Sequence, residues 1–174
     1  TEAQPLLNTI IASGKYTMAT NYVDCFLDSY DNGPERVWEV QFTGGQLGEG
    51  NMFITGELPE GFNDPTVSPF TGYSTALNVT KNLYYSYEPG DIRFNLSILK
   101  GWVNTGVVDT VSQFIIKYHH WDTYTPKDQR DWANNLPILR YTDVLMMNAE
   151  ALNELGYVAN GTAFSILNSV RARA

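Results

Sequence analysis

The sequence predicts a mainly α-helical protein with long irregular loops and a few short strands. Apolar residues recur at steps of three and four near both ends of the chain, over residues 3–13, 141–155 and 163–174. Between these segments, residues 43–89 are rich in glycine, proline and aromatic side chains and show no such period. A chain of 174 residues can bury a real core, and we expect one domain.

The first third of the chain predicts a helix followed by a strand, within a segment that spans residues 1–42. Leu6, Leu7, Ile10 and Ile11 have helical spacing, and Gly14 follows as a stop signal. Residues 37–42 alternate between apolar and polar side chains, which is typical of a short strand. Residues 114–118 are a short apolar run and a plausible partner strand.

Residues 43–135 form a loop-rich region with many aromatic side chains. The whole chain has 11 Tyr, 8 Phe and 4 Trp, against only 17% charged residues. Disordered segments are usually poor in aromatic residues, so this composition argues against disorder. Long ordered loops in compact proteins are often functional, and we therefore look for the binding site in this region.

The last region, residues 136–174, predicts two antiparallel helices. In the first, an apolar stripe that includes Leu145, Asn148 and Leu152 must be covered by other parts of the protein. Asp143 suits the first turn, and Gly156 is expected as the left-handed residue after the last turn. Thr162 is expected to cap the second helix, after a short loop.

The same residues carry a family resemblance. RYTDVLMMNAEALNE at residues 140–154 and LNSVRARA at residues 167–174 resemble the closing signature of the SusD/RagB family of surface glycan-binding lipoproteins. Three shorter segments also resemble the family: ASGKY at 12–16, VWEVQF at 37–42, and GDIRF at 90–94 with the later Lys117-Tyr118. The resemblance is dense at the end of the chain and loose between residues 43 and 80.

The resemblance implies that residues 1–174 are the C-terminal domain of a tetratricopeptide-like helical SusD-type fold, whose N-terminal helical-repeat half is absent from this chain. It also implies a secreted lipoprotein on the extracellular face of the outer membrane, anchored through an acylated cysteine upstream of Thr1. Its partners would be an oligosaccharide or polysaccharide and a SusC-like TonB-dependent transporter. Family members are not enzymes, and no organic cofactor is expected.

Composition excludes several other classes of function. The formal net charge of −8 argues against nucleic acid, which needs clustered Lys and Arg. Cys25 has no partner for an internal disulfide and is expected to be a small buried residue. Residues 44–50 are glycine-rich but lack the Lys-Ser/Thr of a phosphate loop, and His119-His120 alone do not make a zinc site. A surface calcium site is compatible with an extracellular protein, although no EF-hand spacing occurs.

The enzymatic alternative is a glycosidase, which needs two carboxylates across a sugar, one of them kept protonated. Acidic residues do stand beside rings, as in Trp38-Glu39, Trp121-Asp122 and Asp131-Trp132. Any acidic protein of this size offers such neighbours, and no catalytic signature frames them. We therefore predict a binding protein rather than an enzyme.

The predicted binding residues are aromatic or amide side chains in loops, because sugars stack on rings and hydrogen-bond to polar groups. The candidates are Asn63, Phe70, Tyr73, Trp102, Trp121, Tyr124 and Trp132. In the closing helices, by contrast, polar side chains are predicted to lock the helix crossing as scaffold. These are Arg140, Glu150, Asn153, Asn168 and Arg171.

Two alternatives to glycan binding stay open. One is a helical-repeat domain that binds only protein, with the rings serving as core and interface. The other is a peptide cargo within the same family. Glycan binding predicts exposed tryptophans gathered on one face, whereas a protein partner predicts a helix groove and buried rings.

Overall fold

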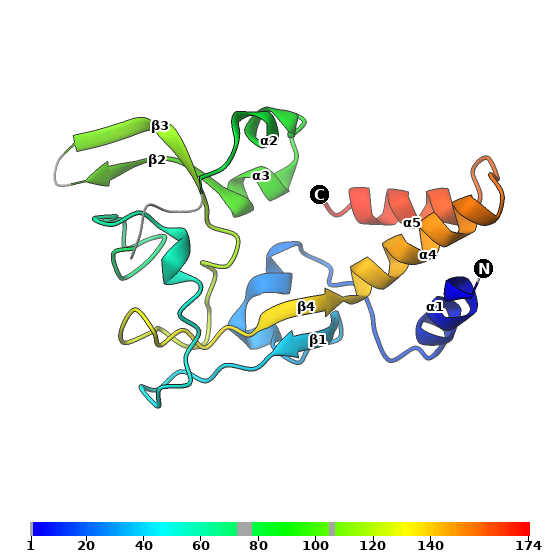
Figure 1. Cartoon of the computed structure of the whole chain (residues 1–174), viewed down its shortest axis with the longest axis horizontal. Coiled ribbons are helices and arrows are strands. Elements are labelled where there is room, and N and C mark those ends of the chain that lie inside the picture. The colour runs from blue at the N-terminus through cyan, green and yellow to red at the C-terminus, as the bar shows by residue number, and fades with distance from the viewer. Residues whose placement is uncertain (1, 73–77, 105–106) are drawn as a thin grey trace. The chain divides into compact units, whose positions relative to one another are not determined.

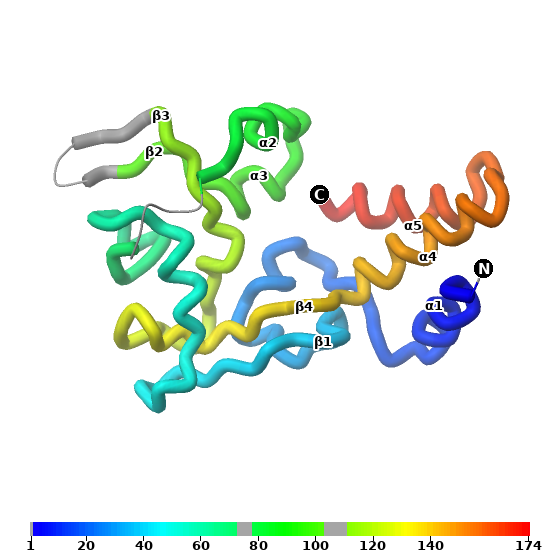
Figure 2. The backbone as a smooth tube through the Cα atoms, viewed as in Figure 1, coloured from blue at the N-terminus to red at the C-terminus, as the bar shows by residue number. Residues whose placement is uncertain are grey.

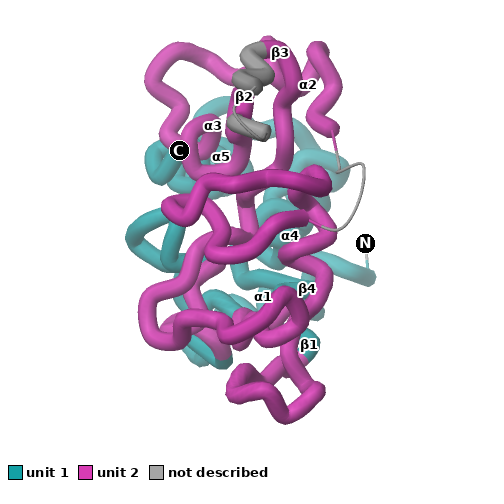
Figure 3. The backbone as a smooth tube through the Cα atoms, turned by 90° about the vertical axis from the view of Figure 1, so that its left-hand side faces the viewer, with its two compact units in different colours: residues 1–25, 32–40, 137–174 teal, residues 26–31, 41–136 magenta. Residues whose placement is uncertain are grey.

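The computed structural model describes residues 2–72, 78–104 and 107–174, without the side chains of 103–104 and 107–110. The chain forms two compact units (Figure 3). Unit 1 contains Thr1–Cys25, Asn32–Val40 and Pro137–Ala174, and unit 2 contains Phe26–Asp31 and Gln41–Leu136. The chain crosses from one unit to the other several times, and the single domain expected from its length stays a prediction.

Unit 1 is built from three helices and a two-stranded sheet (Figure 1). Its elements are α1 (Ala3–Ala12), β1 (Arg36–Val40), β4 (Leu136–Arg140), α4 (Tyr141–Leu155) and α5 (Thr162–Arg171). Helix α4 contacts both α1 and α5, so the predicted closing helix pair and the first predicted helix are confirmed. A short 3₁₀ helix, Val23–Phe26, leads from unit 1 into unit 2.

The partner of β1 is β4, not residues 114–118 as the sequence predicts. Residues 136–140 therefore form a strand, which the sequence-based prediction includes in the closing region 136–174 without assigning it a structure. The helix begins only at Tyr141, because the Arg140 amide donates to the Asp143 carboxylate at 2.9 Å. The Tyr141 amide donates to the carbonyl of Glu35 at 2.8 Å, which ties the helix start to the turn before β1.

The connection between α4 and α5 differs in detail from the predicted caps. Gly156 ends α4 with φ 159° and ψ 128°, which is a positive φ but not the left-handed helical conformation. Gly161, rather than Thr162, is the N-cap of α5, and no side chain caps that end. A Cβ at Gly161 would lie 3.0 Å from the Val158 side chain, so the tight turn favours glycine there.

Unit 2 is mostly irregular, with short helices and one hairpin (Figure 2). Its elements are the 3₁₀ helices Asp28–Tyr30 and Thr55–Glu57, then α2 (Lys81–Ser86), α3 (Ile92–Ser97), β2 (Ile98–Asn104) and β3 (Val107–Ile115). Strands β2 and β3 are antiparallel, with Leu99 opposite Phe114. The register shifts between Lys100 and Trp102, where Gly101 has φ 77°, so a glycine bulge bends β2 just before Trp102.

The core of unit 2 holds large side chains from segments far apart in the sequence. Its buried apolar residues include Phe26, Ile54, Leu58, Phe62, Phe114, Ile116 and Trp132. These residues bury the apolar surface that a region with little regular secondary structure needs in order to fold. The predicted fold class, helices with a few short strands among long loops, is confirmed.

None of the helices described here combines the length and the apolar character that a membrane span requires.

Gly50 lies where two loops of unit 2 approach each other closely. Its neighbour Asn51 bridges to Trp132, and a Cβ at Gly50 would lie 2.1 Å from the Arg130 carbonyl oxygen. We expect Gly50→Ala to lower the free energy of unfolding by about 1–3 kcal/mol, because backbone must move to relieve the overlap. Chemical denaturation measures this loss. Gly56→Ala is the matched control, since nothing lies within 4 Å of its Cβ, and an equal loss there would contradict the explanation.

Candidate functional site

Trp132 lies in the core of unit 2 and offers no surface to a ligand. Its side chain is 0% exposed, and its indole N–H donates to the Thr55 hydroxyl at 2.8 Å. The rings of His119 and Trp121 pack edge-on against it, with centroids 5.6 and 5.3 Å away. The structure therefore corrects its place among the candidate binding residues: Trp132 is a packing residue.

Trp121 remains half-buried at the edge of this core, and the loop that carries it is firmly anchored. The Asp28 carboxylate accepts hydrogen bonds from the amides of Asp122 and Tyr124, both at 2.7 Å. The Ser29 hydroxyl donates a hydrogen bond of 2.6 Å to the Asp122 carboxylate. Ring packing on one side and backbone anchoring on the other hold Trp121 in a fixed position with part of its surface open.

Tyr124 is held by the glycine-rich loop. Its hydroxyl donates to the Asp131 carboxylate and accepts from the Gly45 amide at 2.7 Å. The Gln46 amide donates to the same carboxylate at 2.7 Å. A Cβ at Gly44 would lie 2.3 Å from the Tyr124 ring, so this glycine permits the loop to close over the ring. Gly44 thus has a packing role, and the Tyr124 hydroxyl already has two hydrogen-bond partners.

Trp102 belongs to a separate aromatic group. Its ring stacks on Phe62, with centroids 6.2 Å apart, and meets Phe114 edge-on at 6.1 Å. It is half-buried, and Asn63, next to Phe62 in sequence, is exposed. Phe70 is half-buried, and its carbonyl accepts a hydrogen bond of 2.8 Å from the Ser68 hydroxyl. Tyr73 lies outside the described residues.

The three candidate tryptophans thus fall into two groups rather than one. Trp121 and Trp132 touch each other, and Trp102 touches Phe62 beside Asn63. Within the part of the chain that the structure describes, no ring contact joins the two groups. Whether any of these side chains binds a ligand stays a prediction.

A third aromatic group was not among the candidates. Tyr84, Tyr85, Tyr87 and Phe94, on and beside α2 and α3, line a cavity of about 400 Å³ in unit 2. Tyr85 is 74% exposed. The signal in the sequence was the run Tyr84-Tyr85-Ser86-Tyr87 before Pro89-Gly90-Asp91, where three rings precede a turn.

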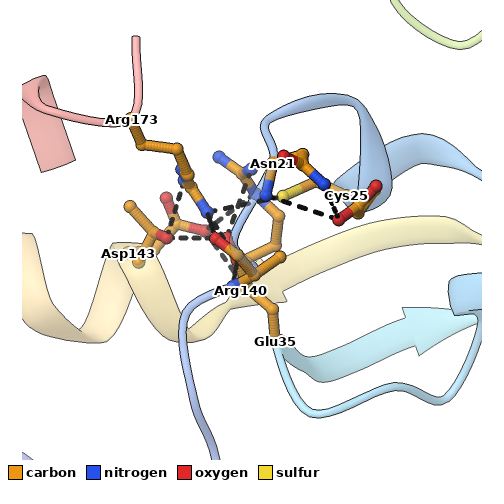
Figure 4. Close-up of polar contacts among 9 residues, drawn as sticks. Asn21, Cys25, Glu35, Arg140, Asp143 and Arg173 are labelled. Atoms are coloured by element: carbon orange, nitrogen blue, oxygen red, sulfur yellow. Dashed lines mark hydrogen bonds and ion pairs between the residues drawn. The ribbon is translucent and has the colours of Figure 1, made fainter.

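A buried ionic cluster organises unit 1, and it centres on Glu35, which is 1% exposed (Figure 4). The Glu35 carboxylate accepts hydrogen bonds from the Arg173 guanidinium and from the Thr142 hydroxyl, each at 2.6 Å. The Ala19 amide donates to it as well, and Arg140 Nη1 lies 3.6 Å from Glu35 Oε1. Four separate segments of unit 1 therefore meet at one carboxylate.

Hydrogen bonds keep this carboxylate charged. Burial alone would raise the pKa of Glu35, but the bonds from Thr142, the Ala19 amide and Arg173 hold it below its ordinary value. Arg173 also donates to the Ala19 carbonyl at 3.2 Å and lies 3.6 Å from the buried thiol of Cys25. Burial, with Glu35 nearby, raises the pKa of that thiol, so Cys25 is a neutral packing residue as predicted.

This cluster corrects the predicted scaffold residues. Arg140 does take part, but the arginine that reaches Glu35 from the end of the chain is Arg173, just after α5, and not Arg171. Glu150 is exposed and lines two cavities, and among the described residues no hydrogen bond or ion pair engages its carboxylate. We therefore assign the scaffold role predicted for Glu150 to Glu35 instead.

The apolar stripe of α4 is only partly covered. Val144 is 0% exposed, but Met147 and Leu155 are 41% and 53% exposed. The open part lines two cavities, of about 430 Å³ between α4 and α5 and about 550 Å³ between α1 and α4. Their walls are mainly Met, Leu and Ala side chains, so they are surfaces suited to apolar contact.

Glu57 and His119 form a buried pair in the core of unit 2. His119 Nδ1 lies 3.4 Å from Glu57 Oε2, and both side chains are almost fully buried. Burial raises the pKa of Glu57 to about 8 and lowers that of His119 to about 3. The folded pair consequently holds one proton between about pH 3 and pH 8.

This pair predicts a loss of stability at alkaline pH. In the unfolded chain the proton is gone above about pH 6.5, whereas the folded pair keeps it to about pH 8. Stability is therefore expected to fall as the pH rises from 6.5 to 8. The amide that Glu57→Gln introduces does not titrate in this range. We therefore expect the variant to show a smaller decrease in Tm between pH 6.5 and pH 8 than the parent chain, as measured by calorimetry. An unchanged slope in Glu57→Gln would contradict the assignment.

The structure gives the histidines no metal partners. His120 Nε2 lies 2.8 Å from the Leu96 carbonyl oxygen, and His119 faces Glu57. Among the described residues, no three His, Cys, Asp or Glu side chains gather as they would around a metal ion. The surface calcium site stays a prediction.

The chain is similar to solved structures over almost its whole length. A SusD superfamily protein from Parabacteroides distasonis is 27% identical, with a TM-score of 0.77 over 99% of this chain. Surface glycan-binding protein A from Bacteroides fluxus is 26% identical, with a TM-score of 0.78 over 99%. A laminarin-binding SusD-like protein is 26% identical, with a TM-score of 0.68 over 91%.

This chain spans 38% of the first of these proteins and 39% of each of the other two. The comparison with curated proteins found no match. The model of the SusD family matches residues 104–174, which include β4, α4 and α5. The family model thus matches the C-terminal part of the chain, and the fold of almost the whole chain is similar to that of a SusD superfamily protein.

Proposed function

We propose that this chain is part of a protein that binds oligosaccharide or polysaccharide at the bacterial cell surface, without catalysis. The observation that carries the proposal is the similarity, at 26% identity, to a surface glycan-binding protein and to a laminarin-binding protein. The half-buried Trp102 and Trp121 and the exposed Tyr85 support it, because fixed rings with open surface suit the apolar faces of sugars.

The carboxyl groups support binding rather than hydrolysis. Glu57 has the raised pKa that a general acid needs, but it is 1% exposed and faces His119 in the core. Asp131 is bound to Tyr124, and Asp91 is paired with Arg93 at 2.6 Å. A carboxyl that is buried or already paired is poorly placed to attack or protonate a glycosidic bond.

We further propose that the protein passes the glycan to a SusC-like TonB-dependent transporter on the extracellular face of the outer membrane. A lipid anchor outside this chain would hold it there. Both statements rest on the similarity to the SusD/RagB family. Co-purification of the transporter with the lipidated protein from detergent-solubilised membranes tests them, and recovery of the protein without any transporter would contradict the partner.

A glycan array with the full chain, followed by titration of each positive sugar, tests the binding function. We expect saturable binding of at least one oligosaccharide and no shorter sugars by chromatography after prolonged incubation. The apolar cavities of unit 1 favour a protein partner as the second candidate function. If the alternative holds, no sugar on the array binds. Met147→Glu, which places a carboxylate in both cavities, would then weaken binding of the protein partner.

A further inference from the structure

The aromatic cavity beside α2 and α3 differs in chemistry from the cavities of unit 1. Tyr84, Tyr85, Tyr87 and Phe94 give it ring walls, and Asp91 and Asn95 add polar groups. The cavities of unit 1 are instead walled mainly by Met, Leu and Ala. Rings with a few polar groups are the combination that sugar binding requires, since a pyranose has apolar faces and a polar rim.

The rings of this cavity brace one another. Tyr84 meets both Tyr85 and Phe94 edge-on, each at 5.1 Å between centroids, and Phe94 meets Tyr87 at 5.4 Å. Lys100 Nζ lies 5.3 Å from the centroid of the Tyr84 ring. Tyr85 touches Tyr84 in this way and is nevertheless 74% exposed, so it is a supported ring with open surface.

The backbone around the rings is also fixed. The Thr80 hydroxyl caps α2 by accepting from the Leu83 amide at 3.2 Å. Asp91 accepts from the Arg93 amide at 3.0 Å and from its guanidinium, while Gly90 makes the turn with φ 93°. The two short helices therefore hold the rings in a defined arrangement, which lowers the entropic cost of binding a ligand.

We propose that this cavity is a subsite for a neutral oligosaccharide, with Tyr85 stacking on a sugar ring and Asn95 hydrogen-bonding to sugar hydroxyls. The inference rests on the proposed glycan-binding function and names where the sugar is held. A neutral sugar fits better than an acidic one. The described residues that line the cavity include the carboxylates of Glu88 and Asp91 but no Lys or Arg, and the chain carries a net charge of −8.

Titration calorimetry of the full chain tests this subsite with a panel of laminarihexaose, cellohexaose, xylohexaose, mannohexaose and maltohexaose. For a sugar that binds, Tyr85→Ala is expected to raise Kd about tenfold or more. Tyr85→Phe keeps the ring and should keep most of the affinity. Tyr157→Ala is the matched control, because Tyr157 is 71% exposed, also packs edge-on against one ring, and lies in unit 1.

The outcomes separate the subsite from the wider function. If the parent chain binds a sugar and Tyr85→Ala binds it equally well, the subsite is wrong while glycan binding stands; a loss in Trp121→Ala would then place the sugar at that ring. Equal losses in Tyr85→Ala and Tyr157→Ala would also overturn the subsite. If the parent binds no sugar of the panel, both proposals fail. Circular dichroism of each variant verifies that the fold is retained.

Discussion

Replacing Glu35 with alanine is expected to lower the free energy of unfolding by about 3–5 kcal/mol, because the buried guanidinium of Arg173 would lose its carboxylate. The Thr142 hydroxyl and the Ala19 amide would lose their acceptor as well. Urea denaturation measures the loss. Glu150→Ala, which removes an exposed carboxylate from the same unit, is expected to cost less than about 0.5 kcal/mol.

A double-mutant cycle sharpens this result. Glu35→Gln, Arg173→Met and the double variant should show a coupling energy of about 1–3 kcal/mol, since the two groups lie 2.6 Å apart and are shielded from water. The pKa of Glu35 is held low in the folded state, so its contribution is present at neutral pH and is lost as the pH falls through the folded pKa. A loss on Glu35→Ala no larger than that on Glu150→Ala would refute the role of the cluster.

Replacing Trp132 with alanine is expected to lower the free energy of unfolding by about 3–5 kcal/mol as well, for a different reason. The indole is completely buried, so its removal leaves a large cavity and deprives Thr55 of a hydrogen bond. The rings of Trp121 and His119 would lose a packing partner. Any loss of sugar binding in Trp132→Ala would thus follow from damage to unit 2 rather than from a lost contact.

Trp38→Ala is the matched control for this substitution, since the Trp38 side chain is 63% exposed. We expect it to change stability by less than about 1 kcal/mol. Thermal unfolding followed by circular dichroism compares the two variants. Equal melting temperatures for Trp132→Ala and the parent chain would contradict the assignment of Trp132 to the core.

The helices of unit 1 could be predicted from the sequence because their signals are local. Apolar spacing over three or four turns identifies α1, α4 and α5 without knowledge of their neighbours. The pairing of β1 with β4 could not be found in this way. It joins segments about a hundred residues apart, and the start of α4 conceals the short strand that precedes it.

Glu35 was missed for a related reason. It follows Asn32-Gly33-Pro34 in what reads as a polar turn, and its partner Arg173 lies 138 residues further along the chain. The sequence pattern instead favours Glu150, which lies within a helix and close to other polar residues. Pairing between distant charged residues depends on the tertiary fold, which the pattern of one sequence does not reveal.

The aromatic residues show the same limit. Trp121-Asp122 and Asp131-Trp132 are nearly mirror images in sequence, yet Trp121 is half-buried at an edge and Trp132 is fully buried. The aromatic composition predicts that some rings are exposed to solvent, but the tertiary packing decides which rings these are. The cavity at Tyr84, Tyr85 and Tyr87 depends on the turn at Gly90, after which Phe94 in α3 meets the rings of Tyr84 and Tyr87.

The central claim is that unit 2 binds sugar while the ionic cluster of unit 1 serves as scaffold. Amide chemical-shift mapping of the full chain, titrated with the sugar that binds best, tests this claim most directly. We predict saturable shifts concentrated in residues 81–102 and 118–124, with the amides of 141–171 largely unaffected. Shifts confined to α4 and α5, or no shifts with any sugar, would contradict the claim.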